Sequence, residues 1–243
     1  MPKTILITGA AKRIGASCAR LMHAEGYSVI VHYQHSEAEA TALIAQLNAI
    51  RADSAWGLSA DLSDSVQLKE LAAVVMKRVE RLDGLIHNAS QFFPCEVANV
   101  DEDVWNQLFN SNLKAPFFLT QALLPLLKQS QASVINMVDI YGQRPLLGHS
   151  VYSLTKAALI AMTQSLAKEL APDIRVNAIA PGAILWPETG HEQTAQVELL
   201  SKVALQRCGE PDDIAKAVRY LMMDAPYMTG QVLNIDGGRS LFI

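Results

Sequence analysis

Short runs of β-branched and apolar residues alternate with longer helical segments along the whole chain. Strands are expected at residues 4–8, 28–32, 55–58, 85–87, 134–138, 175–179 and 232–235. Helices are expected at residues 13–24, 37–50, 66–81, 100–127, 152–170 and 211–222. Strands that are almost wholly apolar and are separated by helices form parallel sheets that are covered on both faces. The sequence therefore predicts an α/β fold, a doubly wound parallel sheet of about seven strands with helices on both faces.

No linker, composition shift or internal repeat divides the 243 residues, so residues 1–243 are expected to form a single domain. Half of the residues are apolar and 18% are charged, which excludes wholesale disorder. The least regular segment, residues 182–194, follows the sixth expected strand. Because ligands bind at the carboxyl ends of the strands in such sheets, we expect a substrate lid at about residues 182–200.

Charge and cysteine content exclude several partners and compartments. The net charge is −4 and no run of Lys or Arg occurs, which argues against nucleic-acid binding. The longest charge-free stretches contain proline and are shorter than the roughly 20 residues of a membrane-spanning helix. The first residues are interpreted as a strand without a small-residue cleavage site, so export is not expected. Cys18, Cys95 and Cys208 have no metal-binding spacing. We therefore expect a cytoplasmic protein with reduced thiols, without a membrane partner or a metal.

The first expected strand ends in a glycine-containing turn that opens a helix, Thr8-Gly9-Ala10-Ala11-Lys12-Arg13-Ile14-Gly15. The glycines permit close approach of the backbone to a ligand, and a helix N-terminus offers free N–H groups to a pyrophosphate. Lys12 and Arg13 stand beside a helix start whose dipole disfavours cations. An anionic ligand would offset that cost. Dinucleotide binding is therefore favoured over a plain tight turn.

The end of the second expected strand carries no carboxylate: it reads Val31-His32-Tyr33-Gln34-His35-Ser36. In NAD enzymes an acidic residue here binds the ribose hydroxyls, and its charge repels a 2′-phosphate. Ser36 and the following helix start are available as hydrogen-bond donors. The sequence thus favours NADP over NAD, and the alternative is that His32 and His35 are surface residues without a ligand.

Tyr152 and Lys156 are four residues apart at the start of an expected helix, which places both side chains on one helix face. We expect the ammonium to lower the pKa of the phenol towards the working range of a general acid. The pair occurs together with the glycine turn, Asn88-Ala89-Ser90, Asn112 in Asn-Leu-Lys-Ala-Pro, and Pro181-Gly182. This set resembles the short-chain dehydrogenase/reductase family over the full chain. The resemblance implies a Rossmann fold and a nicotinamide-dependent oxidoreductase.

Asp139 departs from the usual pattern of that family, in which a serine ends the fifth strand and hydrogen-bonds the substrate carbonyl. A carboxylate beside a developing alkoxide is repulsive, which argues against ordinary ketone reduction. It suits a substrate whose ring nitrogen must receive a proton. Asp139, and Arg13 in place of the usual middle glycine of the turn, resemble the pteridine reductase branch. Members of that branch reduce C=N bonds of biopterin or folate with NADPH.

The resemblance implies a role for each matching residue. Tyr152 and Asp139 supply protons, directly or through water, while Lys156 binds the nicotinamide ribose and tunes the tyrosine. Asn112 belongs to the catalytic set by supporting a helix kink and an ordered water. Phe92 stacks on the pterin, and the other substrate contacts are Arg13, Ser90, Asp139 and Tyr152. NADPH is expected to contact Gly9, Lys12, Arg13, Ile14, Gly15, His32, Tyr33, His35, Ser36, Asp61, Leu62, Asn88, Ala89, Ser90, Tyr152, Lys156, Pro181 and Gly182.

Two alternatives stay open: a general carbonyl or 3-oxoacyl thioester reductase of the same family, and a non-catalytic NADP(H)-binding sensor. The intact tyrosine–lysine pair speaks against the sensor. Biopterin, monapterin and dihydrofolate are equally compatible with the sequence. Tyr141 and His149 are candidates for the mouth of the site, whereas Trp186, Glu188 and His191 in the expected lid have no assigned role. The resemblance also implies a homotetramer in which the helices at 100–127 and 152–170 pack across a two-fold axis.

Overall fold

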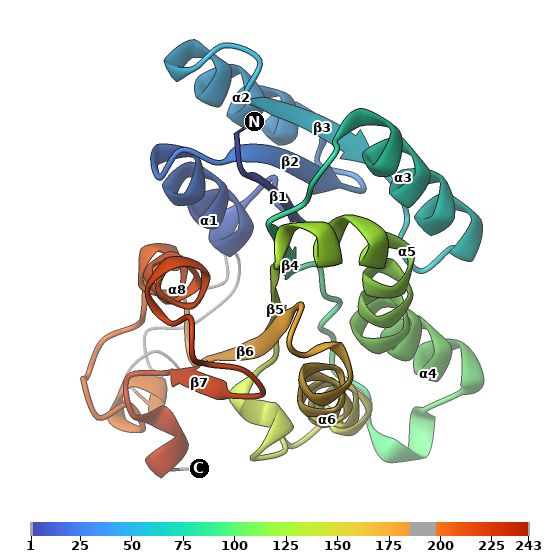
Figure 1. The fold of residues 1–243 in the computed structure, drawn as a ribbon. Helices are drawn as coiled ribbons and strands as arrows, with labels where there is room; N and C mark the ends of the chain where they lie inside the picture. Colours follow the sequence, from blue (N-terminus) through green and yellow to red (C-terminus); the bar gives the residue numbers. More distant parts are fainter. Residues whose placement is uncertain (1, 185–197, 243) are drawn as a thin grey trace.

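One parallel sheet organises the computed structural model, which describes residues 2–184 and 198–242. The sheet has seven strands in the order β3-β2-β1-β4-β5-β6-β7, and every adjacent pair is parallel (Figure 1). The strands are β1 (Thr4–Ile7), β2 (Ser28–Tyr33), β3 (Ala55–Ser59), β4 (Gly84–His87), β5 (Ser133–Met137), β6 (Arg175–Pro181) and β7 (Val232–Ile235). The predicted doubly wound sheet is confirmed.

Helices cover both faces of this sheet. They are α1 (Arg13–Ala24), α2 (Glu37–Ile50), α3 (Ser65–Arg78), α4 (Glu102–Phe109), α5 (Ala115–Ser130), α6 (Ser150–Leu170) and α8 (Pro211–Arg219). Figure 1 shows α1 and α8 on one side of the sheet and α3 and α5 on the other, and each of these pairs is in contact. Within the described residues, no helix combines the length and apolarity needed to cross a bilayer.

The alternation of side chains along β1 explains why the strands are apolar throughout. Ile5 and Ile7 pack into the core formed with α1, α2 and α8, whereas Leu6 points to the opposite core, with α3, α5 and α6. All three are fully buried. Both faces of a strand in such a sheet need apolar residues, which removes the polar–apolar alternation of a half-exposed strand.

The single helix expected at residues 100–127 is wrong, because two helices are joined there by a π-helical turn, Asn110–Lys114. The first, α4, begins after Asp101, whose side chain accepts the N–H of Val104 at 2.8 Å. Pro116 lies in the first turn of α5, which continues directly from this π-helical turn, so its missing N–H leaves one upstream carbonyl without a helical donor. The wide turn carries the buried Asn112 and supplies the predicted kink.

The direction of winding reverses between β1 and β4. From β1 the chain proceeds outward to β2 and β3, then returns to place β4 on the other side of β1. The two loops that leave β1 and β4 therefore diverge, and a crevice opens between them at the carboxyl ends of the strands. The glycine turn and Asn88-Ala89-Ser90 occupy these two loops.

Candidate active site

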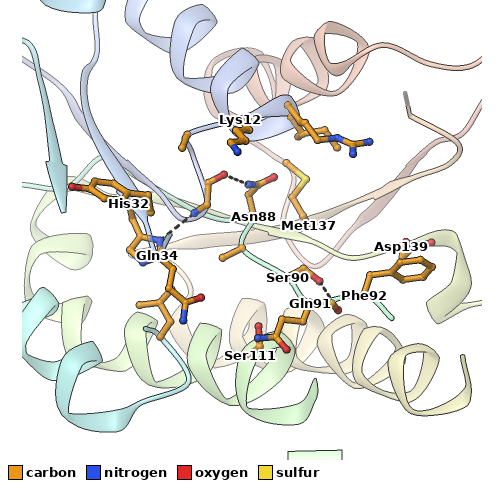
Figure 2. Close-up of a pocket in the computed structure, with 18 of the residues that line it drawn as sticks. Lys12, His32, Gln34, Asn88, Ser90, Gln91, Phe92, Ser111, Met137 and Asp139 are labelled. Atoms are coloured by element: carbon orange, nitrogen blue, oxygen red, sulfur yellow. Dashed lines mark hydrogen bonds between the residues drawn. The ribbon is translucent and has the colours of Figure 1, made fainter. Parts of the chain in front are cut away.

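A cavity of about 650 Å³ lies at this reversal point, along the carboxyl ends of the strands. In Figure 2, His32 and Gln34 lie at one end of the cavity and Phe92 and Asp139 at the other. The structure brings every residue of the predicted catalytic, cofactor and substrate sets except Asn112 into its lining; of the two candidates for the mouth, Tyr141 lines the cavity and His149 does not. Residues that the sequence analysis did not assign also contribute: Ala11, Gln34, Ala60, Ser63, Gln91, Ser111, Met137, Val138 and Ile184. Most of these directly follow or precede an assigned residue. Their position in the sequence next to assigned residues could therefore have identified them as lining residues.

The expected lid at about residues 182–200 is only partly visible. Gly182 and Ile184 line the cavity. Residues 185–197, with Trp186, Glu188 and His191, lie outside the described residues. The lid therefore stays a prediction.

The glycine turn between β1 and α1 is sterically constrained at both glycines. Gly9 has φ +61°, and a Cβ atom on Gly15 would lie only 2.4 Å from the carbonyl oxygen of Gly9. Arg13 has φ +51°, a left-handed conformation that normally favours glycine. No side chain caps the N-terminus of α1. A side chain at either glycine would meet atoms of the turn or of the loop after β4, so these segments pack closely. The N-terminus of α1, which no side chain caps, is available to a pyrophosphate.

Two polar residues of the turn region have protein partners. Lys12 pairs with Glu39 of α2, and both side chains are about half exposed. Glu39 therefore offsets the charge of Lys12 in part, and the expected contribution of an anionic ligand stays a prediction. His32 is buried, accepts the Gly9 N–H at 3.1 Å through Nδ1, and donates from Nε2 to the Ala60 oxygen at 3.1 Å. Burial lowers the pKa of His32 to about 4, so the ring is neutral and supports the turn.

Thr8 and Asn88 join the two loops on either side of the cavity. Thr8 Oγ1 accepts the N–H groups of Asn88 and Ala89, each at 2.9 Å. Asn88 Nδ2 donates to the carbonyl oxygens of Thr8 and Gly9, again at 2.9 Å (Figure 2). This Thr8–Asn88 clamp fixes the position of the glycine turn relative to the loop after β4.

Asn112 lies behind the cavity and is a positioning residue. Its Oδ1 accepts from Ser90 Oγ at 3.1 Å and from the Gln91 N–H at 2.8 Å. Its Nδ2 donates to the Gln91 oxygen at 2.9 Å and to Thr155 Oγ1 at 3.2 Å. These contacts use the side chain to connect the loop after β4 with α6, which agrees with the expected supporting role at a helix kink; the ordered water stays a prediction.

Asp139, Tyr152 and Lys156 converge at the end of β5. The Tyr152 hydroxyl donates to Asp139 Oδ2 at 2.7 Å. Lys156 Nζ donates to the Met137 carbonyl oxygen at 2.9 Å and lies 5.6 Å from the centroid of the Tyr152 ring. Tyr152 and Lys156 are both buried, one turn apart on α6, as the spacing predicted.

Burial dominates the protonation of these three groups. It raises the pKa of Asp139, while hydrogen bonds from the Tyr141 N–H and from Tyr152 act in the opposite direction. Burial and the nearby Asp139 carboxylate raise the pKa of Tyr152. Burial lowers the pKa of Lys156 to about 8, against the effect of Asp139. The expected lowering of the Tyr152 pKa is therefore wrong in this structure: the phenol retains its proton and donates it in a hydrogen bond.

Phe92 lines the cavity, and its ring packs against two neighbouring aromatic side chains. His149 stacks on it with centroids 4.6 Å apart and planes 13° apart. Tyr152 meets it edge-on at 4.7 Å and 84°. Phe92 is nevertheless 54% exposed. Since His149 covers one face, a stacked ligand has only the other face of the ring.

Known proteins match the chain over nearly its whole length. A family model described as Enoyl-(Acyl carrier protein) reductase matches residues 9–240. Pteridine reductase 1 of Leishmania tarentolae is 35% identical over 277 aligned positions, which cover 97% of this chain and 96% of that protein. The chain belongs to the short-chain dehydrogenase/reductase family. Members of this family are oxidoreductases that use NAD(P)H.

Relatives with a different substrate are equally similar. The 3-oxoacyl-[acyl-carrier-protein] reductase FabG of Staphylococcus aureus is 34% identical, with 98% of each chain covered. FabG of Thermotoga maritima is 35% identical, with 97% of each chain covered. Overall identity thus assigns this short-chain dehydrogenase/reductase to no substrate, and the choice depends on individual site residues.

Proposed function

We propose that this chain is an NADPH-dependent pteridine reductase that converts a dihydropterin or dihydrofolate to its tetrahydro form. The observation that carries the proposal is the 2.7 Å hydrogen bond from the Tyr152 hydroxyl to Asp139 at the end of β5. A carboxylate there disfavours an alkoxide and suits delivery of a proton to a ring nitrogen. The three free cysteines fit a reducing compartment, so the proposal includes a cytoplasmic location.

The cavity fits a dinucleotide with a 2′-phosphate. The glycine turn offers N–H groups at one side, and His35 and Ser36 line the end of the cavity beyond β2. His35 is exposed, and Ser36 precedes α2 without capping it through its side chain. No carboxylate stands at the end of β2, where one would repel a phosphate. NADPH is therefore the proposed cofactor, and it supplies the hydride when bound.

The chain itself supplies the protons and the orientation. Tyr152 holds a proton on its hydroxyl, and Asp139 is placed to receive it or to pass one through water to the substrate nitrogen. Lys156, whose ammonium is fixed by the Met137 carbonyl, provides the positive charge beside the phenol. The free face of Phe92 offers a flat apolar surface to a pterin ring.

A 3-oxoacyl reductase is the second candidate, and the FabG relatives favour it. A substrate panel separates the two candidates. With NADPH we expect turnover of dihydrobiopterin, dihydromonapterin or dihydrofolate, and slower turnover with NADH. The decrease in NADPH absorbance with time, at a fixed enzyme concentration, measures each rate. Turnover of a 3-oxoacyl thioester or a simple ketone, with none of any pterin, would contradict the proposal.

We also propose a homotetramer built on α5 and α6. A groove of about 570 Å³ between these helices is lined by Phe109, Leu113, Phe117, Phe118 and Met162, among others. Phe117 and Phe118 are 39% and 44% exposed. Neighbouring exposed aromatic side chains are typical of a surface that another protein chain covers. Phe118→Glu is expected to convert the tetramer to smaller species in light scattering, because a carboxylate would be buried in the interface. Val66→Glu, on the exposed side of α3, is the matched control and should leave the mass unchanged.

A further inference from the structure

A tight turn after β7 directs the Arg239 side chain into the protein interior. Gly237 and Gly238 have φ +62° and +80°, conformations that favour glycine. The Asp236 carboxylate accepts the N–H groups of Gly238 at 2.9 Å and Ser240 at 2.8 Å. Arg239 follows this turn and is 8% exposed. The local backbone therefore directs a long cationic side chain inward.

The buried guanidinium has one hydrogen-bond partner among the described residues. Its Nη2 donates to the Tyr141 hydroxyl at 2.8 Å, and its central carbon lies 5.8 Å from the centroid of the same ring. Nε and Nη1 have no acceptor in residues 2–184 and 198–242. No carboxylate in these ranges pairs with Arg239. A buried charge without a counter-charge is costly, so its position calls for an explanation.

Tyr141 connects Arg239 with the active site. It belongs to the short turn Ile140–Gly142 that follows Asp139, and its ring lines the cavity. Its own N–H donates to Asp139 Oδ1 at 2.9 Å. Arg239 therefore binds the hydroxyl of Tyr141, while the backbone N–H of Tyr141 binds the Asp139 carboxylate. Gln143, one residue past the turn, hydrogen-bonds Asn234 of β7 and ties the same segments together.

The charges around Asp139 come from three elements. Tyr152 and Lys156 face it from α6, Tyr141 from the turn after β5, and Arg239 from the turn after β7. The positive charges of Lys156 and Arg239 both lower the pKa of Asp139, against the effect of burial. Of these two cations, only Lys156 lines the cavity.

We propose that Arg239 is a positioning residue for the reduction, one that fixes the Tyr141 ring against the cavity and places a permanent positive charge behind Asp139. This inference rests on the proposed function in one respect, the use of Asp139 in proton delivery. The arrangement itself, a cation held on the phenol of Tyr141 while the Tyr141 backbone N–H holds Asp139, can be tested without any substrate.

The test is a titration of the Asp139 side-chain carboxyl by carbon-13 NMR, with NADP⁺ present, in the full-length protein. Arg239→Met removes the charge and keeps much of the length of the side chain. We expect it to raise the Asp139 pKa, since an opposite charge nearby favours the ionised form and this variant removes it. Arg239→Lys keeps the charge and should titrate close to the wild type.

Tyr141→Phe is the second variant and is independent of the first. It removes the hydroxyl that holds the guanidinium and leaves the ring and the charge in the protein. We expect a smaller rise of the Asp139 pKa, because Arg239 is no longer held in place. In turnover with a pterin, the acidic limb of the pH profile of kcat should move to higher pH in both variants.

The outcomes separate this inference from the proposed function. If folded Arg239→Met titrates like the wild type, the inference is overturned. If that variant does not fold, an unchanged Asp139 pKa in Tyr141→Phe overturns it instead. If the pKa rises as expected while the wild-type enzyme reduces no pterin, the proposed function fails and the role of Arg239 stands.

Discussion

Replacing Tyr152 with phenylalanine is expected to lower kcat by about 10³-fold, the range that loss of a general acid produces. The substitution removes one oxygen and keeps the ring that packs edge-on against Phe92. It deletes the hydroxyl that donates to Asp139 at 2.7 Å, so no side chain holds a proton at that point. Turnover with NADPH and a dihydropterin measures the loss. Fluorescence titration should show NADPH affinity close to the wild-type value.

Tyr220→Phe is the matched control. Tyr220 is 43% exposed in the turn that follows α8, and it does not line the cavity. The same loss of one hydroxyl there should leave kcat unchanged. Retention of more than about a tenth of the activity by Tyr152→Phe would show that another group supplies the proton. If the wild type turns over none of the tested substrates, the sensor hypothesis gains instead.

Asp139→Ser is expected to lower pterin reduction by about 100-fold, again by removal of a group that delivers a proton. Serine restores the residue that the family usually has at the end of the fifth strand, so the same change should help a carbonyl or 3-oxoacyl substrate. Asp139→Asn keeps the shape of the side chain and still accepts from Tyr152, but it cannot carry the proton. We expect both variants to lose pterin turnover, measured with saturating NADPH.

The control for these variants is Asp173→Ser, at an exposed position in the turn before β6. It removes the same kind of carboxylate from a position that does not line the cavity. A rise in pterin turnover on Asp139→Ser, or equal turnover of pterin by the Ser, Asn and wild-type proteins, would argue against proton delivery through Asp139. Turnover of 3-oxoacyl thioesters by the wild type, with none of any pterin, would support the second candidate.

Much of the fold and the cavity could be predicted, because the relevant patterns are local. Apolar runs and helical spacing gave the order of the elements, and the ends of the strands identified the cavity lining. The kink at Asn110–Lys114 was expected, but the division into two helices was not. The side chain of Asn112 forms hydrogen bonds with Gln91 and Thr155, which are far from it in the sequence. No local pattern contains such a contact.

Long-range electrostatics were the other source of error. Spacing placed Lys156 beside Tyr152, but the sign of the tyrosine pKa shift depends on burial and on Asp139, thirteen residues earlier. Lys12 was explained by an anionic ligand, and the structure adds Glu39 of α2 as a protein partner. Arg239 gave no signal in the sequence beyond following Asp236-Gly237-Gly238, and only the fold brings it to Tyr141.

The Thr8–Asn88 clamp has a thermodynamic consequence. It holds the glycine turn to the loop after β4 by hydrogen bonds within the protein, so the conformational entropy of these loops is lost when the chain folds. A dinucleotide then binds a preorganised surface and loses little further entropy in ordering it. Folding and ligand affinity become linked, because only folded molecules present that surface. Substitutions remote from the cavity that lower the free energy of unfolding should therefore weaken apparent binding only when the unfolded fraction becomes appreciable.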